Sequence, residues 1–476
     1  MLPNLAAPWL RPFLCSPARA SLAAATLSAV TLGACESSRM SGQWGIVAPV
    51  PVGAQSAALL PTGKVLLFQD GEQMYIWDPA TQQFGPQFSS NTNLHCAGLA
   101  FLADGRLLAV GGHEGQDDED HWLGLRSAEV FDPWQESWTR LPDMAGRERW
   151  YPTAVTLPNG RVLVASGTHA GVHNKAIELF DPIRQEWQVV AQQQLPMYPW
   201  AAVVPSGELI LYGPQVQTAY FDWTSGTFTE AGRMSERRDG GAAAFLNAET
   251  AEVLALGGGN PTTSTTEMFD ASAGEWRALP SMARPRHYPD VVLLPDGTAL
   301  VVGGHTSDPE REEERTAEDV LTVEVLDVER RRWSEVAPTN YSHGYHSTAL
   351  LLPDGSVLAA GPERQLEVFR PWYVVQSEDR PAVASSPERA GYGQTFSVTT
   401  AQDVNVVRVV VIRSSSVTHA HNTDQRYLEL EFEEVSDRDF SVRGPVSSTI
   451  APPGYYLLFV VNEEGVPSEG RFVRIG

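Results

Sequence analysis

The sequence predicts an all-β protein in which a seven-bladed β-propeller is followed by a β-sandwich. Three observations predict this fold. A hairpin-turn phrase recurs through the first 355 residues, an Asp and an aromatic residue recur behind it, and alternating apolar and polar residues follow where the repeat stops. Charged residues are only 19% of the chain, whereas Gly and Pro are plentiful, which is typical of many short strands joined by turns.

The turn phrase, as in Leu157-Pro158-Asn159-Gly160, ends in a glycine and is followed by an apolar run. Glycine supplies the positive φ that a tight connection between two antiparallel strands requires. A looser copy with a longer turn lies between Leu246 and Leu254. The turn glycines of the other six copies are Gly63, Gly105, Gly160, Gly207, Gly297 and Gly355.

A second anchor follows each of six turns, an Asp with an aromatic residue six positions later. Each unit therefore predicts four short antiparallel strands, and its length of about 40 to 60 residues is that of a kelch-type propeller blade. Seven turns predict seven blades. The anchor pairs are Asp78/Phe84, Asp132/Trp138, Asp181/Trp187, Asp222/Phe228, Asp270/Trp276 and Asp327/Trp333.

The last unit lacks its final aromatic strand, while an unassigned segment beginning at Trp44 precedes the first unit. Residues 44–49 resemble residues 333–338, the final strand of the sixth unit. We expect the Trp44 strand to complete the seventh blade and close the ring, because an open array would leave sheet edges exposed.

The repeat ends near Val375, and the polar residues 376–381 predict a linker. Apolar and polar residues then alternate in several short runs, which predicts an immunoglobulin-like β-sandwich. The predicted domains are a signal segment (1–34), a short tether (35–41), the propeller (42–375) and the sandwich (376–476).

The N-terminus predicts export. Residues 21–34 are apolar, too short to span a membrane comfortably, and follow Arg11 and Arg19 with no acidic residue. Leu32-Gly33-Ala34-Cys35 resembles a bacterial lipobox, which predicts a secreted or extracytoplasmic lipoprotein anchored through Cys35. The alternative is an ordinary cleaved signal in which Cys35 has no role.

The formal charge of −24 excludes nucleic acid and anionic lipid surfaces as partners attracted by charge. A membrane contact is expected only through the N-terminal anchor, and we expect a monomer. Beyond the N-terminal region Cys96 is the one cysteine, so no internal disulfide is expected.

The repeat places particular side chains at one height. Cys96, Tyr151 and His346 each lie nine residues before a turn glycine, just ahead of the innermost strand of a blade, and should line one mouth of the central channel. Tyr198 and Tyr288 share this position, where aromatic residues are commonly channel walls. A cysteine alone is usually a small buried apolar residue, but its position at the channel mouth makes Cys96 a candidate functional residue. We call these five sites the mouth positions.

Four further strings stand out: Leu94-His95-Cys96-Ala97-Gly98, Arg149-Trp150-Tyr151-Pro152-Thr153, Gly344-Tyr345-His346-Ser347, and residues 418–426 beginning Thr418-His419. With them the chain resembles the galactose oxidase and glyoxal oxidase family of copper radical oxidases over about residues 42–476. The resemblance implies one copper ion on the propeller axis. Its ligands would be Tyr151 and His346 in the equatorial plane, Tyr345 in the axial position and His419 from the C-terminal domain, with a thioether joining Cys96 to Tyr151.

These residue types suit that chemistry, since imidazole and phenolate donors match Cu(II). One copper moves one electron, and oxidising a C–H bond to a carbonyl moves two. A Tyr151 radical, stabilised by the Cys96 sulfur, would supply the second, with Tyr345 as general base. Dioxygen would then be reduced to hydrogen peroxide.

The substrate is less defined. His169 occupies the place of the tryptophan that stacks over the thioether in galactose oxidase, and Trp122 or Trp150 could shield the radical instead. We expect His169, Trp122 and Tyr288 to line the substrate pocket, with a small aldehyde, a primary alcohol or a terminal glycan hydroxyl as substrate. The alternative function is a non-catalytic extracytoplasmic kelch protein that binds a glycan or a protein. The enzyme is favoured because the chain retains all five side chains of the implied redox site, which are Cys96, Tyr151, Tyr345, His346 and His419.

Overall fold

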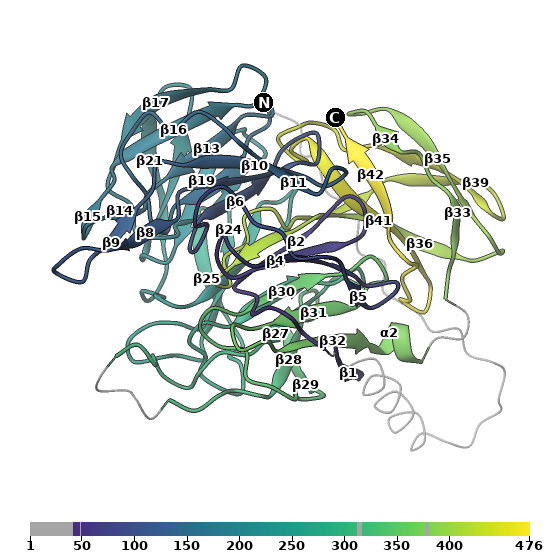
Figure 1. Cartoon of the computed structure of the whole chain (residues 1–476). Coiled ribbons are helices and arrows are strands. Elements are labelled where there is room, and N and C mark those ends of the chain that lie inside the picture. The colour runs from purple at the N-terminus through teal and green to yellow at the C-terminus, as the bar shows by residue number, and fades with distance from the viewer. Residues whose placement is uncertain (1–40, 48, 312–316, 377–379) are drawn as a thin grey trace. The chain divides into compact units, whose positions relative to one another are not determined.

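The computed structural model describes residues 41–47, 49–311, 317–376 and 380–476 (Figure 1). Nearly all of its regular structure is β-strand, and the described helix is the single turn α2 (Trp372–Val375). The all-β fold class is therefore confirmed. The predicted signal segment and Cys35 lie outside the described residues.

Seven sheets in the described part of the chain each contain four strands that come from one copy of the repeat, and every pairing within them is antiparallel. The apolar runs that follow the turn glycines form their buried second strands. The seven sets are β2 (Ser56–Leu59), β3 (Val65–Phe68), β4 (Met74–Asp78) and β5 (Gln83–Phe84); β6 (Gly98–Phe101), β7 (Leu107–Val110), β10 (Ala128–Asp132) and β11 (Ser137–Arg140); β12 (Thr153–Thr156), β13 (Val162–Ala165), β16 (Ala176–Asp181) and β17 (Glu186–Gln192); β18 (Trp200–Val203), β19 (Leu209–Gly213), β20 (Gln217–Asp222) and β21 (Thr227–Arg233); β22 (Ala242–Asn247), β23 (Glu252–Leu256), β24 (Thr266–Asp270) and β25 (Glu275–Leu279); β26 (Asp290–Leu293), β27 (Thr298–Val302), β28 (Val323–Asp327) and β29 (Arg332–Val336); and β30 (Thr348–Leu351), β31 (Val357–Ala360), β32 (Leu366–Pro371) and β1 (Gly42–Ile46).

The first strands of neighbouring sheets contact one another. Strand β6 contacts β12, β12 contacts β18, β22 contacts β26, β26 contacts β30, and β30 contacts β2. First strands that lie side by side in this way are the innermost strands of a propeller. We retain seven blades as the interpretation of these sheets.

Strand β1 completes the sheet of the last repeat. It pairs antiparallel with β32 and sets Trp44 opposite Phe369. The Trp44 indole also donates a 2.8 Å hydrogen bond to the Ala337 carbonyl. The N-terminal strand therefore ties the last repeat to the start of the chain, as the sequence predicts.

The repeated turn residues have the predicted geometry. The six turn glycines have φ values between 79° and 92°, a region that L-residues with a Cβ adopt at a cost. The anchor aspartates hold the turn between the third and fourth strands; Asp132, for example, accepts hydrogen bonds from the backbone N–H groups of Trp134 and Gln135. Side chains that satisfy turn backbone in this way explain why Asp recurs.

The C-terminal residues form two sheets whose inner faces share one apolar cluster, which includes Val398, Val411, Phe440 and Leu458. This is the packing of a β-sandwich. One sheet contains β33 (Val383–Ser385), β35 (Thr395–Thr400), β40 (Asp439–Arg443) and β39 (Phe432–Ser436), and the other contains β34 (Arg389–Ala390), β42 (Arg471–Ile475), β41 (Gly454–Asn462), β36 (Val406–Arg413) and β38 (Tyr427–Leu430).

One strand of the C-terminal part belongs to a propeller sheet instead. Strand β37 (Ser416–Thr418) pairs antiparallel with β2, with Thr418 opposite Ser56, and becomes the fifth strand of the first sheet. We call residues 416–426, which begin with this strand, the central segment.

The central segment hydrogen-bonds to the first strands of four further sheets. Thr423 donates to Ala154 of β12, and Arg426 donates to Val203 of β18. Asp424 accepts from the backbone of Phe101 in β6, and Gln425 accepts from that of Leu293 in β26. Residues that sequence analysis places in the second domain thus fill the interior of the first.

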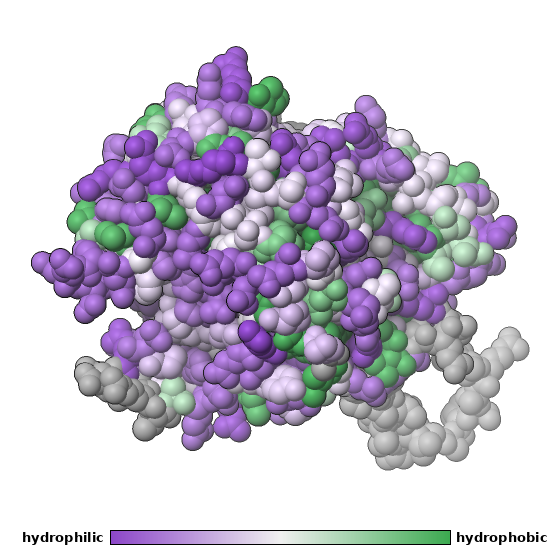
Figure 2. All heavy atoms as spheres, in the orientation of Figure 1, coloured by the Kyte–Doolittle hydropathy of each residue, from purple (hydrophilic) through white to green (hydrophobic). Residues whose placement is uncertain are grey.

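The face shown in Figure 2 is mostly hydrophilic, with apolar side chains scattered over it. This agrees with the acidic composition of the chain. Within the described ranges, no helix combines the length and the apolar character needed to cross a bilayer.

Candidate functional site

The mouth positions share one unusual backbone conformation. Cys96, Tyr151, Tyr198, Tyr288 and His346 all have φ between 43° and 69°, the left-handed region that side chains with a Cβ seldom occupy. Such residues tend to occur at functional sites, where the surrounding structure imposes the conformation. Backbone hydrogen bonds link neighbouring positions, because the Tyr151 N–H donates to the Cys96 carbonyl and the Tyr198 N–H donates to the Tyr151 carbonyl, both at 3.1 Å.

Buried glutamates of the third strands hold the loops that lead into these positions. The Glu178 carboxylate accepts from Arg149, two residues before Tyr151, and from the backbone of Ala145 and Gly146. Equivalent pairs recur around the repeat: Glu267 with Arg238, Glu324 with Arg286, and Glu367 with His343. Both members of the Arg149–Glu178 pair have fully buried side chains. A paired charge of this kind fixes the loop because leaving either partner alone in the interior is costly.

The central segment delivers His419. Its β37 strand is fixed against β2, and the hydroxyl of Thr418 lies 2.7 Å from His419 Nδ1. The Gln55 amide donates to His419 Nε2 at 2.7 Å. The Nδ1 atom therefore carries the hydrogen and donates it to Thr418, and Nε2 keeps its lone pair.

The structure brings the four sequence-predicted ligands together. The phenolic oxygens of Tyr151 and Tyr345 are 2.5 Å apart. The rings of Tyr345 and His346 stack with centroids 3.8 Å apart, and the His346 and His419 rings meet edge to face at 4.5 Å. The Tyr151 and His419 rings are 4.9 Å apart. Two imidazoles and two phenols from three separate parts of the chain thus converge on one point.

Cys96 lies fully buried in the same place. It forms a small apolar cluster with Tyr151 and Tyr198, which Trp150 packs against, and its Sγ is 3.3 Å from His419 Nε2. Burial raises the pKa of the Cys96 thiol to about 12. The thiol is therefore protonated at neutral pH in the absence of a metal or an oxidant.

Burial sets the charge state of the predicted ligands. It raises the pKa of the Tyr151 phenol well above its usual value, with Cys96 and Tyr345 adding to the rise, and it raises the pKa of Tyr345 as well. It lowers the pKa of His346 to about 4 and that of His419 well below its usual value. All four side chains are thus neutral at pH 7, a state in which a bound cation would favour the phenolates and use the imidazole lone pairs.

These side chains fit copper. His346 Nε2 is buried and has no hydrogen-bond partner among the described residues, so this nitrogen is available to bind an ion. Buried polar atoms are normally paired, and a metal ion is one explanation for an exception. Nitrogen and phenolate oxygen donors together are the set that Cu(II) prefers.

The predicted pocket residues differ in their distance from this cluster. The Tyr288 ring lies against that of Tyr345, with centroids 4.5 Å apart. Trp150 meets Tyr151 edge-on at 4.3 Å and 82°, and Trp122 stacks on Trp150 at 5.3 Å. The His169 ring donates to or accepts from no group of the cluster in the described residues; its Nδ1 lies 3.2 Å from the Gly124 carbonyl. Trp150 is therefore the tryptophan in contact with Tyr151.

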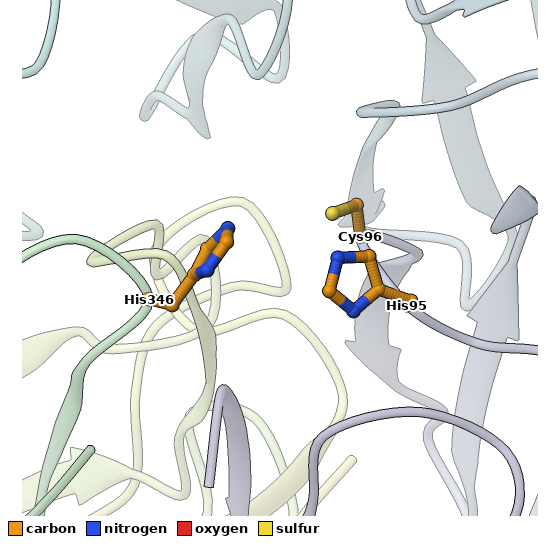
Figure 3. A group of neighbouring side chains, drawn as sticks. All are labelled: His95, Cys96 and His346. Atoms are coloured by element: carbon orange, nitrogen blue, oxygen red, sulfur yellow. The ribbon is translucent and has the colours of Figure 1, made fainter. Parts of the chain in front are cut away.

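Sequence analysis missed two residues of the cluster. The Gln55 amide donates to both Cys96 Sγ and His419 Nε2, and His95 belongs with Cys96 and His346 to a group whose ligand atoms all lie within 4.8 Å of one another (Figure 3). Gln55 lies eight residues before the turn glycine Gly63 and belongs neither to the turn phrase nor to the Asp anchor, so it gave no signal. His95 directly precedes a mouth position, as Tyr345 does, and that shared position is a signal that could have found it.

Comparisons with known proteins agree with this geometry. The family model "Glyoxal oxidase N-terminus" matches residues 73–369, and "Galactose oxidase-like, Early set domain" matches residues 380–475. The chain is 26% identical to galactose oxidase of Gibberella zeae over 495 residues, covering 91% of this chain and 70% of that protein. It is 28% identical to the aldehyde oxidase GLOX of Vitis pseudoreticulata over 452 residues, covering 81% and 82% of the two chains.

Among solved structures, a fungal alcohol oxidase in complex with copper is similar, with a TM-score of 0.82 and 25% identity. The alignment covers 91% of this chain and 99% of that one. Since the first family model alone spans more than half of the sequence, the chain belongs to the glyoxal oxidase family.

Proposed function

We propose that this protein is a copper radical oxidase that oxidises a primary alcohol or an aldehyde by two electrons and reduces dioxygen to hydrogen peroxide. The observation that carries the proposal is the 2.5 Å contact between the Tyr151 and Tyr345 hydroxyls beside two neutral imidazoles. The copper oxidase found among similar structures and the family of the chain support it.

Tyr151, Tyr345, His346 and His419 would hold the ion. When bound, copper supplies a one-electron acceptor, lowers the pKa of coordinated hydroxyls and passes electrons to dioxygen. The side chains supply the rest of the chemistry. Tyr345, whose ring lies against those of His346 and Tyr288, takes the proton of the substrate hydroxyl.

One of the two electrons leaves the substrate as part of a hydrogen atom. An oxidised Tyr151 accepts this hydrogen from the carbon that bears the hydroxyl, and its neighbours stabilise the radical before that step. Cys96 lies in its cluster, so that a thioether to the ring would spread the unpaired electron onto sulfur. Trp150 covers the Tyr151 ring edge-on and excludes water from it.

The substrate we propose is small, either an aldehyde in its hydrated form, a primary alcohol or a terminal glycan hydroxyl. Tyr288 is the pocket candidate in contact with a proposed ligand, Tyr345. Trp122 instead stacks on Trp150, and His169 contacts the Gly124 carbonyl. We further propose an extracytoplasmic monomer that Cys35 anchors to a membrane through lipid.

The test is peroxide release by the full-length, copper-loaded protein with small aldehydes and primary alcohols. We expect Tyr151→Phe to lower turnover at least about 1,000-fold, because the radical site is lost and general acid–base and positioning effects alone remain. Tyr198→Phe is the matched control, since Tyr198 is a buried phenol 4.6 Å from Tyr151 that makes a hydrogen bond to the Ala97 carbonyl instead. A linked Cys96–Tyr151 peptide, lighter by two hydrogens, should appear in the wild type alone.

The alternative is a non-catalytic protein that binds a glycan or a protein. A wild type that takes up no copper, releases no peroxide and forms no linked peptide would favour it and sink the oxidase.

A further inference from the structure

His95 lies at the proposed copper centre without a role in the resemblance that identifies the other ligands. Figure 3 shows His95 and Cys96 on one side and His346 facing them, with one nitrogen of His95 turned toward the Cys96 sulfur. The ligand atoms of the three residues lie within 4.8 Å of one another. A side chain that served only to fill this space would need no nitrogen there.

The surroundings of His95 select one tautomer. Its Nδ1 is 3.3 Å from the Gln69 carbonyl, and because a carbonyl oxygen can only accept, Nδ1 carries the hydrogen. The other nitrogen, Nε2, keeps its lone pair. A histidine that donates one N–H to a backbone carbonyl and offers the other nitrogen is the usual arrangement of a metal ligand.

The orientation of the ring is fixed as well. The His113 ring meets that of His95 edge to face at 5.0 Å, and the His95 backbone N–H donates to the Asn93 side chain at 2.9 Å. The imidazole is therefore held in one tautomer and in one orientation.

The other imidazoles stand around the same space. The His95 ring is 5.6 Å from that of His346 and 6.4 Å from that of His419, at interplanar angles of 76° and 81°. Nitrogens that share an ion at about 2 Å lie up to about 4 Å apart. The ligand atoms of His95 and His346 lie within 4.8 Å of one another, so a movement of about 1 Å would bring the two imidazoles to one ion.

We propose that His95 Nε2 is a fifth protein donor to the copper, which gives the centre three imidazoles where the family resemblance implies two. The inference rests on the proposed copper oxidase function and adds to it. A third imidazole nitrogen strengthens the hold on Cu(II).

The experiment compares wild type with His95→Phe and His95→Gln, each loaded with one equivalent of Cu(II) as full-length protein. Any tyrosyl radical is first reduced, and pulsed electron paramagnetic resonance counts the imidazoles through their remote nitrogens. We expect three in the wild type and two in both variants. A competition titration with nitrilotriacetate should show copper affinity reduced at least roughly tenfold, since even outer-shell partners of metal ligands are worth 10- to 100-fold.

His121→Phe is the matched control, because it removes an exposed histidine that pairs with Asp117 and leaves the His113 and Asn93 contacts of His95 in place. It should keep three imidazoles. Unchanged thermal unfolding of the copper-free variants shows that they fold.

The outcomes are distinct. Two imidazoles in the wild type, or an unchanged count and affinity in folded His95 variants, overturns the His95 ligand while the oxidase stands. A change in KM with an unchanged imidazole count also overturns it, because His95 would then contact substrate and not copper. No copper binding by the wild type overturns both proposals.

Discussion

At the scale of single residues, one proposed copper ligand is already engaged in a hydrogen bond with a neighbouring side chain, Gln55. Gln55 is fully buried, and its amide nitrogen donates hydrogen bonds to both His419 Nε2 and Cys96 Sγ. An ion that binds His419 must displace that hydrogen bond. Gln55 is therefore a competitor of the metal and holds the two groups in register before the metal arrives.

This competition gives a prediction for Gln55→Leu. Copper affinity should rise by roughly 2- to 10-fold, the equivalent of one net hydrogen bond that no longer has to be broken. A competition titration measures the change, with the exposed Gln87→Leu as control. Weaker binding in Gln55→Leu would show that Gln55 supports the bound ion instead.

The sequence predicts the mouth positions because a hairpin repeat has a fixed length. Nine residues before five of the six turn glycines lie Cys96, Tyr151, Tyr198, Tyr288 and His346, and all five share the left-handed conformation. Contacts that depend on side-chain direction were not predictable in this way. His95 and Gln55 face the cluster because of loop geometry that no spacing encodes.

At the scale of elements, a buried Glu three residues before the anchor Asp recurs in four repeats, at positions 129, 178, 267 and 324. The pattern was present in the sequence, but its meaning depends on partners from the preceding loop, such as Arg286 for Glu324. Each pair links a sheet to the loop that precedes its own first strand, and in the sheets of Glu178 and Glu324 this loop presents a mouth position. Stability and site geometry are thus coupled through the same bonds.

We expect Glu324→Ala to lower the free energy of unfolding by about 3 to 5 kcal/mol, because Arg286 remains as an unpaired charge in the interior. The matched control is Arg277→Ala, which removes the partly exposed partner of Asp270 and should cost less than about 1 kcal/mol. Denaturant unfolding of both variants checks the difference. Similar losses of unfolding free energy in the two variants would mean that the buried pair contributes no more to stability than the partly exposed one.

At the scale of the whole molecule, the interior keeps several histidines uncharged. Burial lowers the pKa of His113 and His346 to about 4 and that of His421 to about 3. Their pKa in the unfolded chain is about 6.5, so below that pH the unfolded state binds more protons than the folded state. The contribution to stability is complete above pH 6.5 and is lost as the pH falls toward 3 to 4.

The copper-free protein should therefore unfold at progressively lower temperature as the pH is lowered from 7 to 4. Four acids act in the opposite direction, because burial raises the pKa of Glu249, Asp290, Asp296 and Asp424 and their protonation favours the folded state. The histidines outnumber them, since burial also lowers the pKa of His95 and of His419. Calorimetry across this range checks the sign. A midpoint that stays constant or rises would contradict the buried neutral histidines.

Sequence periodicity was sufficient for the class of fold and for the closure through Trp44, since both follow from repeated local patterns. It could not show that Thr418 pairs with Ser56, because strands 362 residues apart carry no shared local signal. The resemblance of residues 418–426 marked them as important. The hydrogen bonds of Thr423, Asp424, Gln425 and Arg426 to four different sheets give the physical reason.

That central segment also imposes an order in time on how the protein becomes active. The five propeller sheets that it pairs with or hydrogen-bonds to are encoded earlier in the chain, so translation finishes these walls of the site before it produces His419. A chain cut short before residue 416 lacks both the strand that fills the first sheet and the last imidazole of the proposed centre. Under the proposed chemistry, a prematurely terminated product cannot mature into a peroxide-producing enzyme, and oxidising power is reserved for completed molecules.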